Sequence, residues 1–128
     1  MNLLVADDEN LELKVLEKTI KKFFLNELDI FMASNGKQAA GIVENTDINI
    51  ALLDIEMPRM DGFEVATQIR NSDRLKNLPI VMITSRTGEK HRERAFDIGV
   101  NDYMGKPFQE ADLLARIHHI LDLQDDAD

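Results

Sequence analysis

The chain has 128 residues, enough for one domain with a sizeable core, and its 44% apolar and 30% charged residues are ordinary for a globular protein. The absence of cysteine excludes disulfides, thiolate metal sites and cysteine nucleophiles, and it fits a reducing cytoplasm. The net charge of −9 argues against non-specific binding to nucleic acid and favours a cationic ligand or a basic partner surface.

Apolar strands and amphipathic helices alternate along the first half of the chain. The pattern predicts strands at 2–6, 28–33 and 48–53, and helices at 10–25 and 37–44. The apolar stripe expected to face the core from the first helix consists of Val15, Leu16, Ile20, Phe23 and Phe24. The third strand is apolar almost throughout, which is typical of a strand covered on both faces.

The second half continues the alternation. A loop at 57–62 precedes a helix that ends near Asn71, and Leu78-Pro79 leads into the fourth strand. A helix at 89–98 stops at Gly99, a fifth strand covers 100–104, and the last helix covers 108–121. We expect residues 1–122 to form the single domain and residues 123–128 to form a frayed, solvated acidic tail.

Five strands that alternate with five helices predict an α/β fold with a doubly wound parallel sheet. Right-handed crossovers place helices on both faces of such a sheet. The flavodoxin-like strand order for a five-stranded sheet is 2-1-3-4-5. In this order the first and third strands are neighbours.

Polar side chains follow four of the predicted strands at the point where each strand ends. Asp7 and Asp8 follow the first strand, Asp54 the third, Thr84 the fourth and Lys106 the fifth. Open α/β sheets bind ligands at this edge. Three clustered carboxylates raise one another's pKa unless a cation joins them. Carboxylates, backbone oxygens and waters suit Mg²⁺, so the sequence predicts a magnesium site that contains a nucleophilic carboxylate.

Each of these residues also has a simpler interpretation. Asp54 could be an ordinary loop or helix-capping aspartate, Thr84 a β-branched strand residue and Lys106 a solvated surface lysine. The predicted convergence favours a functional carboxylate at Asp54, a hydroxyl at Thr84 that contacts an anion, and a lysine at Lys106 that offers a point charge to a phosphoryl group.

The motifs resemble the receiver domain of two-component response regulators over essentially the whole chain. The matching pieces are the acidic pair Asp7-Asp8, the strand 51–54 that ends in Asp54, the loop 57–62, Ile83-Thr84, Tyr103 and Lys106-Pro107. Each piece is weak alone, but all of them in this order and at these spacings are specific to the family.

The resemblance implies a role for each matching residue. Asp54 would accept the phosphoryl group, and Thr84 and Lys106 would contact the phosphoryl oxygens. Mg²⁺ would bind the side chains of Asp8 and Asp54 and the backbone carbonyl of Glu56, with Asp7 acting through water. Tyr103 would be the switch aromatic that follows Thr84 inward after phosphorylation, and the peptide bond before Pro107 would be cis, as is usual in the family.

The resemblance also implies partners and a location. A histidine kinase or a phosphotransfer protein would supply the phosphoryl group, and a downstream protein, rather than nucleic acid, would bind the switched surface. Neither a signal-peptide pattern nor a membrane-spanning run is present in the sequence, so we expect a cytoplasmic protein with no membrane partner. The oligomeric state, the kinase and the output stay open.

Two other functions fit parts of the pattern. Phosphatases of the haloacid dehalogenase type also combine an aspartyl nucleophile, Mg²⁺, Thr or Ser and Lys on a parallel sheet. They place the nucleophile on an early strand with an aspartate two residues later, whereas here Glu56 stands two residues after Asp54. The other alternative is a receiver that binds partners without phosphate, and the intact set of Asp54, Thr84 and Lys106 argues against it.

Overall fold

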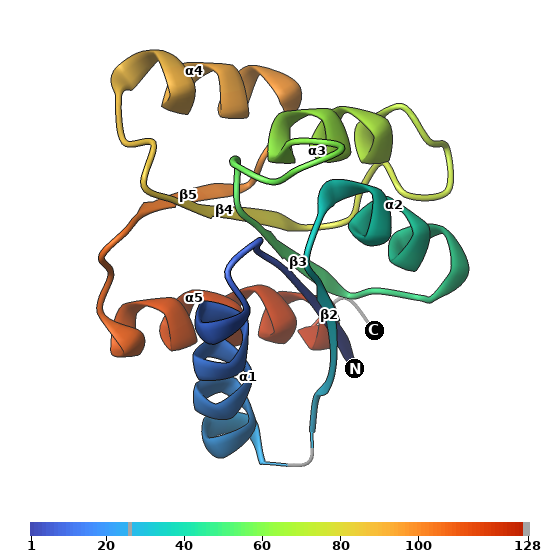
Figure 1. Ribbon diagram of the computed structural model, residues 1–128. Helices are drawn as coiled ribbons and strands as arrows, with labels where there is room; N and C mark the ends of the chain where they lie inside the picture. The colour runs from blue at the N-terminus through green and yellow to red at the C-terminus, as the bar shows by residue number, and fades with distance from the viewer. Residues whose placement is uncertain (26, 127–128) are drawn as a thin grey trace.

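A computed structural model describes residues 1–25 and 27–126, which form alternating strands and helices (Figure 1). The strands are β1 (Asn2–Ala6), β2 (Asp29–Ala33), β3 (Ile50–Leu53), β4 (Ile80–Thr84) and β5 (Asp102–Gly105). The helices are α1 (Asn10–Phe24), α2 (Gly36–Asn45), α3 (Gly62–Arg70), α4 (Glu89–Ile98) and α5 (Glu110–Asp126). Among these described residues, no helix combines the length and the apolar composition that crossing a membrane requires.

The sheet confirms the expected topology. All pairings are parallel, and the strand order is β2-β1-β3-β4-β5. Ala6 at the end of β1 is in register with Leu53 at the end of β3. The residues that follow these two positions, Asp7 and Asp54, therefore emerge next to each other at the carboxyl edge of the sheet.

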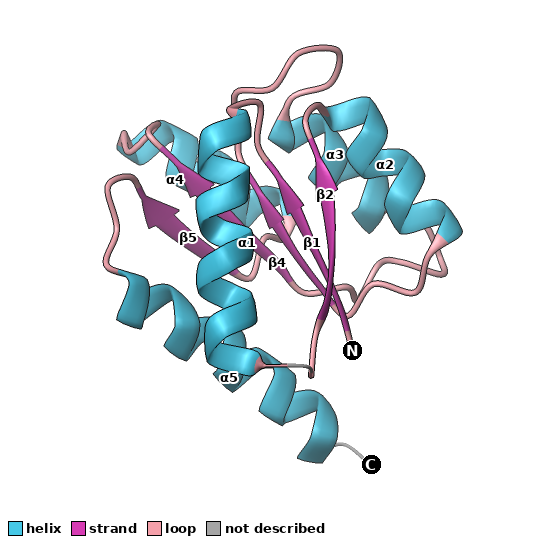
Figure 2. Ribbon diagram, turned by 60° about the horizontal axis from the view of Figure 1, so that its bottom comes forward, coloured by secondary structure: helices cyan, strands magenta, loops and turns pink. Residues whose placement is uncertain are grey.

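Helices cover both faces of the sheet, as the alternating pattern predicts. In Figures 1 and 2, α1 and α5 lie on one face, and α2, α3 and α4 lie on the other. Alternate residues of the central strands supply the two cores. Leu3, Val5 and Leu52 belong to the core under α1 and α5, whereas Leu4 and Leu53 belong to the core under α2, α3 and α4. Both cores thus end at the same carboxyl edge.

The buried stripe of α1 differs from the predicted stripe. Leu13, Leu16, Ile20 and Phe24 are buried on α1, as their spacing of three and four residues requires. Val15 and Phe23 were expected in the core but are 51% and 52% exposed. The prediction was wrong for these two because each lies one position from a stripe residue, a rotation of about 100° around the helix.

Several element boundaries also differ from the prediction: β5 covers Asp102–Gly105 rather than residues 100–104, and α5 begins at Glu110 rather than at residue 108. At the start of β3 and at the end of α5, hydrogen bonds of Asn49 explain the difference. β3 begins at Ile50 rather than at residue 48 because the side chain of Asn49 accepts a hydrogen bond from the backbone N–H of Asn2 at 2.7 Å. The side chain of Gln124 donates to the Asn49 carbonyl at 2.8 Å. α5 therefore continues to Asp126, into the segment expected to be a frayed tail. Residues 127 and 128 of that tail lie outside the described residues.

The start of α3 lies directly against the strand that carries Asp54. A Cβ atom on Gly62 would lie 2.2 Å from the carbonyl oxygen of Asp54, so only glycine allows this approach. Asp61 accepts a hydrogen bond from the Glu64 N–H, and Glu64 returns one to the Asp61 backbone, which forms a capping box. This contact places the loop 57–61 over the end of β3.

Candidate functional site

The carboxyl edge of the sheet brings together the polar residues that the sequence placed there. Asp7 and Asp54 are 2% and 8% exposed, although their side chains are acidic. Thr84 ends β4 and is fully buried, and the backbone N–H of Lys106 donates to the Thr84 carbonyl at 2.8 Å. Buried carboxylates require a cation or hydrogen-bond donors nearby.

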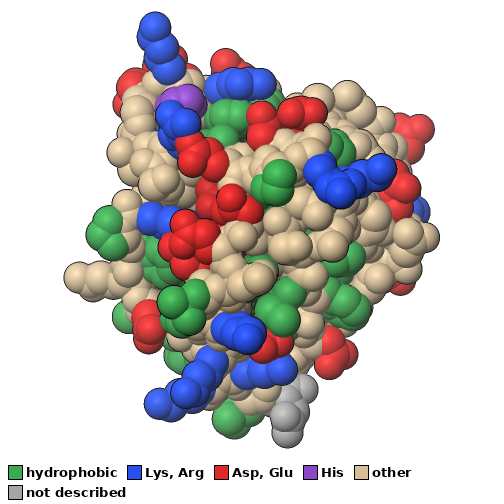
Figure 3. All heavy atoms as spheres, in the orientation of Figure 1, with side chains coloured by type: hydrophobic (Ala, Val, Ile, Leu, Met, Phe, Trp, Pro, Cys, Tyr) green, Lys and Arg blue, Asp and Glu red, His purple; other side chains and the backbone are tan. Residues whose placement is uncertain are grey.

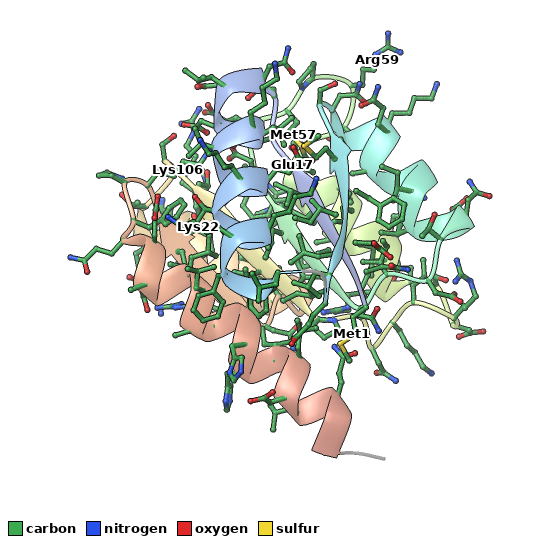
Figure 4. All side chains as sticks on the ribbon, turned by 90° about the horizontal axis from the view of Figure 1, so that it is seen from below. Met1, Glu17, Lys22, Met57, Arg59 and Lys106 are labelled. Carbon is green, nitrogen blue, oxygen red and sulfur yellow. The ribbon has the colours of Figure 1, made fainter. Side chains whose placement is uncertain are left out.

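Lys106 supplies that cation. Its ammonium group lies 2.7 Å from an oxygen of Asp7, 2.6 Å from one of Glu12 and 2.9 Å from one of Asp54. We call Asp7, Glu12 and Asp54 the carboxylate cluster. In Figure 4, Lys106 lies beside α1, on the side of the loop that leads into α5. The Lys106–Pro107 peptide bond is cis, as the resemblance implied.

The cluster changes the acidity of its members. Burial alone would lower the pKa of Lys106, but hydrogen bonds to the three carboxylates outweigh burial and raise the pKa above its ordinary value. Burial raises the pKa of Asp7, and the contact with Glu12 raises it further, while Lys106 opposes both effects. The ammonium is therefore permanently charged at neutral pH and offsets part of the negative charge of the site.

Glu12 is a site residue that the sequence interpretation missed. Glu12 lies in the first turn of α1, where an acidic residue is common because it interacts favourably with the helix dipole. In the structure its carboxylate reaches Lys106 from the helix that follows Asp7 and Asp8. The available signal was its position on the first helical turn after the acidic pair, at the same edge of the sheet.

Asp8 and Glu56 make no contact with Lys106 and are not members of the carboxylate cluster. Asp8 is exposed, and its pKa is raised by burial of part of the carboxyl and then by the charges of Asp7 and Asp54. The carboxylate of Glu56 pairs with Arg86, which leaves only its backbone carbonyl for the role that we predicted.

The oxygen atoms at this edge fit a divalent cation. One oxygen from each member of the carboxylate cluster lies within 4.8 Å of the others, and Asp8 adds a further negative charge beside them. Magnesium prefers such hard oxygen ligands and keeps part of its water shell. Burial is the main cause of the raised pKa values of Asp7 and Asp8, and neighbouring carboxylates raise both further, so a bound cation would favour the ionised form of each.

A second set of contacts lies on the other side of Asp54. The backbone of Arg86 connects two buried side chains, because its N–H donates to the Thr84 hydroxyl at 3.2 Å and its carbonyl accepts from the Tyr103 hydroxyl. Tyr103 is 5% exposed, and burial raises its pKa. We expected Tyr103 to move inward after phosphorylation, but the ring already lies inside, held by this hydrogen bond.

The site opens onto a hollow of about 650 Å³ between α1 and the loop that leads into α5. Asp54 and Lys106 line its inner part, and Leu11, Val15 and Phe108 line its apolar part. In Figure 3, acidic side chains gather at the middle of this face, with Lys and Arg side chains beside them. Arg59, in contrast, points away from the site at the tip of the loop 57–61 (Figure 4).

Comparison with known proteins agrees with this geometry. The family model of the response regulator receiver domain matches residues 3–118. The chain is 33% identical over 121 residues to the response regulator MprA of Mycobacterium sp. (strain KMS), covering 94% of this chain and 50% of MprA. It is 32% identical over 119 residues to the transcriptional regulatory protein SrrA of Staphylococcus aureus (strain NCTC 8325), covering 93% and 47%. The chain thus spans about half the length of these relatives.

Solved structures show the same fold. The receiver domain of the sensor histidine kinase PA1611 from Pseudomonas aeruginosa, which holds a magnesium ion in its active site cleft, superposes with a TM-score of 0.80 at 27% identity. That match covers 91% of this chain and 92% of the other. The chemotaxis protein CheY4 of Vibrio cholerae has the same fold, with a TM-score of 0.84 at 23% identity and coverage of 93% and 97%. The chain therefore belongs to the response regulator receiver domain family.

Proposed function

We propose that this domain accepts a phosphoryl group on Asp54 from a phosphohistidine of a partner protein, and that the phosphoryl group then switches a protein-binding surface. The observation that carries the proposal is the position of Asp54. Its carboxylate lies at the inner end of an open hollow, 2.9 Å from the Lys106 ammonium and next to the acidic pair at the end of β1.

The chemistry needs alignment and charge neutralisation more than covalent help. An oxygen of Asp54 attacks phosphorus, the bond from phosphorus to the histidine nitrogen breaks, and its electron pair stays on that nitrogen. An acyl phosphate forms on Asp54. The Lys106 ammonium faces the developing charge, and the buried hydroxyl of Thr84 has a proton to donate to a phosphoryl oxygen.

Mg²⁺ fits the oxygen atoms of the site, and we assign its ligands to the side chains of Asp8 and Asp54 and the backbone carbonyl of Glu56, with Asp7 acting through water. When bound, the ion neutralises charge on the phosphoryl oxygens. The magnesium ion in the active site cleft of the PA1611 receiver domain supports the choice of metal.

The switch would use the contacts that end at Tyr103. A phosphoryl oxygen that binds the Thr84 hydroxyl would hold Arg86 through its backbone N–H, and Arg86 in turn holds the Tyr103 hydroxyl. The phosphoryl group would thus stabilise an arrangement that the protein already adopts, and it can shift the population only as far as these contacts differ between the two states. The output surface would be formed by α4, β5 and α5, which carry Arg92 and Arg116.

Protein partners suit the surface better than nucleic acid does. The apolar part of the hollow, with Leu11 and Val15 76% and 51% exposed, would receive the phosphodonor, a histidine kinase or a phosphotransfer protein. The net charge of −9 would repel nucleic acid from the domain, and we expect the domain to work in the cytoplasm.

A turnover phosphatase is not favoured. The receiver family model covers residues 3–118, and in a phosphatase of the haloacid dehalogenase type the nucleophile would stand on an early strand rather than directly after β3. We expect only self-catalysed acceptance and loss of phosphate, so a phosphatase assay with excess substrate should show no multiple turnover.

The test is to incubate the protein with Mg²⁺ and acetyl phosphate and to map the modified residue by mass spectrometry. Asp54 should carry the only label, and the label should disappear in Asp54→Ala. Asp97→Asn, which removes an exposed acid on α4, is the matched control and should label like the wild type. Persistent labelling of Asp54→Ala, or a stable label on a histidine, would contradict the proposal.

A further inference from the structure

We propose that Glu12 is a positioning residue that competes with the phosphoryl group for Lys106 and so limits the phosphorylated state. This inference rests on the proposed function of Asp54, because it concerns the regulation of the same site. Glu12 lies in the first turn of α1, whereas the residues of the proposed phosphoryl site lie at or directly after the ends of strands.

The first step is that Lys106 has no free donor in the unphosphorylated protein. A lysine ammonium has three N–H groups. Its three close contacts go to the three members of the carboxylate cluster, at 2.6 to 2.9 Å. A phosphoryl oxygen can therefore bind the ammonium only if one of these carboxylates gives up its hydrogen bond.

The second step compares Asp7 and Glu12, the two partners of Lys106 that do not carry the phosphoryl group. Of these two, Glu12 can give up its hydrogen bond to Lys106 without strain. Asp7 is held from two sides, because it also accepts a hydrogen bond from the backbone N–H of Glu9 at 3.0 Å and its side chain is only 3% exposed. Glu12 has a longer side chain that is 39% exposed, and it reaches Lys106 across the rim of the hollow. Water can replace Lys106 around Glu12 but has little access to Asp7.

The third step concerns charge. A Glu12 oxygen lies within 4.8 Å of oxygens of Asp7 and Asp54. When Asp54 carries a phosphoryl group, Glu12 both loses its share of the ammonium and faces additional negative charge. Like charges at such separation repel in a partly buried site. Glu12 therefore stabilises the unphosphorylated state relative to the phosphorylated one.

Substitution of Glu12 by glutamine tests the effect of its charge while the side chain keeps its size. Glu12→Gln keeps the size of the side chain, removes its charge and offers an amide N–H to a phosphoryl oxygen. We expect beryllofluoride, a phosphoryl mimic, to bind Glu12→Gln roughly fivefold more tightly than wild type in saturating Mg²⁺, a modest change because the side chain is partly screened. Glu12→Ala should bind more tightly as well, which keeps the test independent of the glutamine side chain.

The matched control is Glu9→Gln. Glu9 lines the same hollow and its loss changes the net charge equally, but its carboxylate is not a partner of Lys106. Glu9→Gln should change beryllofluoride affinity much less. A second measurement follows the side-chain ammonium signal of Lys106 by NMR without Mg²⁺ or beryllofluoride. That signal should change in Glu12→Gln and stay unchanged in Glu9→Gln.

The outcomes are distinct. Unchanged or weaker beryllofluoride binding in Glu12→Gln and Glu12→Ala would overturn the inference, and so would equal gains in Glu12→Gln and Glu9→Gln. Weaker binding of Mg²⁺ alone in Glu12→Gln than in Glu9→Gln, together with weaker beryllofluoride binding, would make Glu12 a metal ligand and overturn it too. If wild type binds no beryllofluoride and takes no label on Asp54, the proposed function itself fails, whatever the Lys106 signal shows.

Discussion

The two sides of Asp54 hold their neighbours by different interactions. On the side of α1, one ammonium is surrounded by three carboxylates, and the side chain of Lys106 is only 16% exposed. On the side of α4, Thr84 and Tyr103 are joined through the backbone of Arg86 by hydrogen bonds between uncharged groups. An ion pair on this side, between Arg86 and Glu56, has side chains about half exposed, at 53% and 51%.

This difference separates two tasks within one site. Interactions among buried charges are strong, so the α1 side fixes the electrostatics around Asp54 and responds steeply when one charge is added or removed. Hydrogen bonds between neutral groups are weaker individually, at about 1 kcal/mol net, so the α4 side can rearrange at little cost. The first side is suited to holding a charged group, and the second is suited to passing on a change.

The largest difference between the α1 side and the α4 side should appear when the ammonium group of Lys106 is removed. Lys106→Ala would leave Asp7, Glu12 and Asp54 together without a counter-charge, and we expect the free energy of unfolding to fall by about 3 kcal/mol in metal-free buffer. Urea unfolding measures it. Lys21→Ala, which removes an exposed lysine from a pair with Glu17 within α1, is the control and should cost at most about 0.5 kcal/mol. Equal losses of unfolding free energy in the two variants would show that the buried pairs of Lys106 stabilise the protein no more than a surface pair does.

Magnesium should also reduce the repulsion among the carboxylates of the site, because it adds positive charge. At about 100 times its dissociation constant, Mg²⁺ should stabilise the protein by about 2.7 kcal/mol. Because Asp8 is an assigned ligand, Asp8→Asn should lose most of this gain. A melting curve that shifts equally in wild type and Asp8→Asn would place the ion elsewhere.

Without metal, Asp8→Asn should be more stable than wild type rather than less stable. The pKa of Asp8 is raised in the folded protein, so its ionisation destabilises the fold at pH 7. Asp8→Asn should therefore be more stable than wild type there, by less than about 1 kcal/mol because the side chain is exposed. The gain should shrink as the pH falls through the raised pKa of Asp8 toward the ordinary value of 3.8. A gain independent of pH would contradict this cause.

The α4 side should show a much smaller effect than the removal of Lys106. Tyr103→Phe removes the hydroxyl that donates to the Arg86 carbonyl, and we expect a loss of about 1 kcal/mol with no loss of phosphoryl acceptance on Asp54. Arg86→Ala is the matched control, because it keeps that carbonyl and removes only the exposed pair with Glu56, at a cost of about 0.5 kcal/mol or less. If Tyr103→Phe destabilised the protein as much as Lys106→Ala, the two sides would not differ.

How far the sequence predicted this site depends on the kind of residue. Asp7, Asp54 and Thr84 end strands, and strand ends follow from the apolar runs before them, so their meeting at one edge was predictable. Glu12 was not predicted, because whether a residue in the first turn of a helix faces a site depends on the rotation of that helix. The same rotation was misjudged for Val15 and Phe23.

Other differences have a similar origin in contacts between distant segments. The extra turn of α5 depends on Gln124 meeting Asn49, a pair 75 positions apart in the chain. The inward position of Tyr103 depends on the carbonyl of Arg86, which local sequence preferences do not place. Local pattern thus predicted the elements and their order, whereas the packing of one element on another decided the remaining details.

The pairing of Lys106 with Asp7 also links the site to synthesis of the chain, because the two residues are 99 positions apart. A growing chain that has made β1 to β4 already carries Asp7 and Asp54 but not yet Lys106. Contacts between such distant positions form late, since a long loop must close first. The pocket would thus stay uncompensated, and a poor phosphoryl acceptor, until the fifth strand docks. We therefore expect partly folded chains, in which β5 has not yet docked, to accept little phosphate on Asp54.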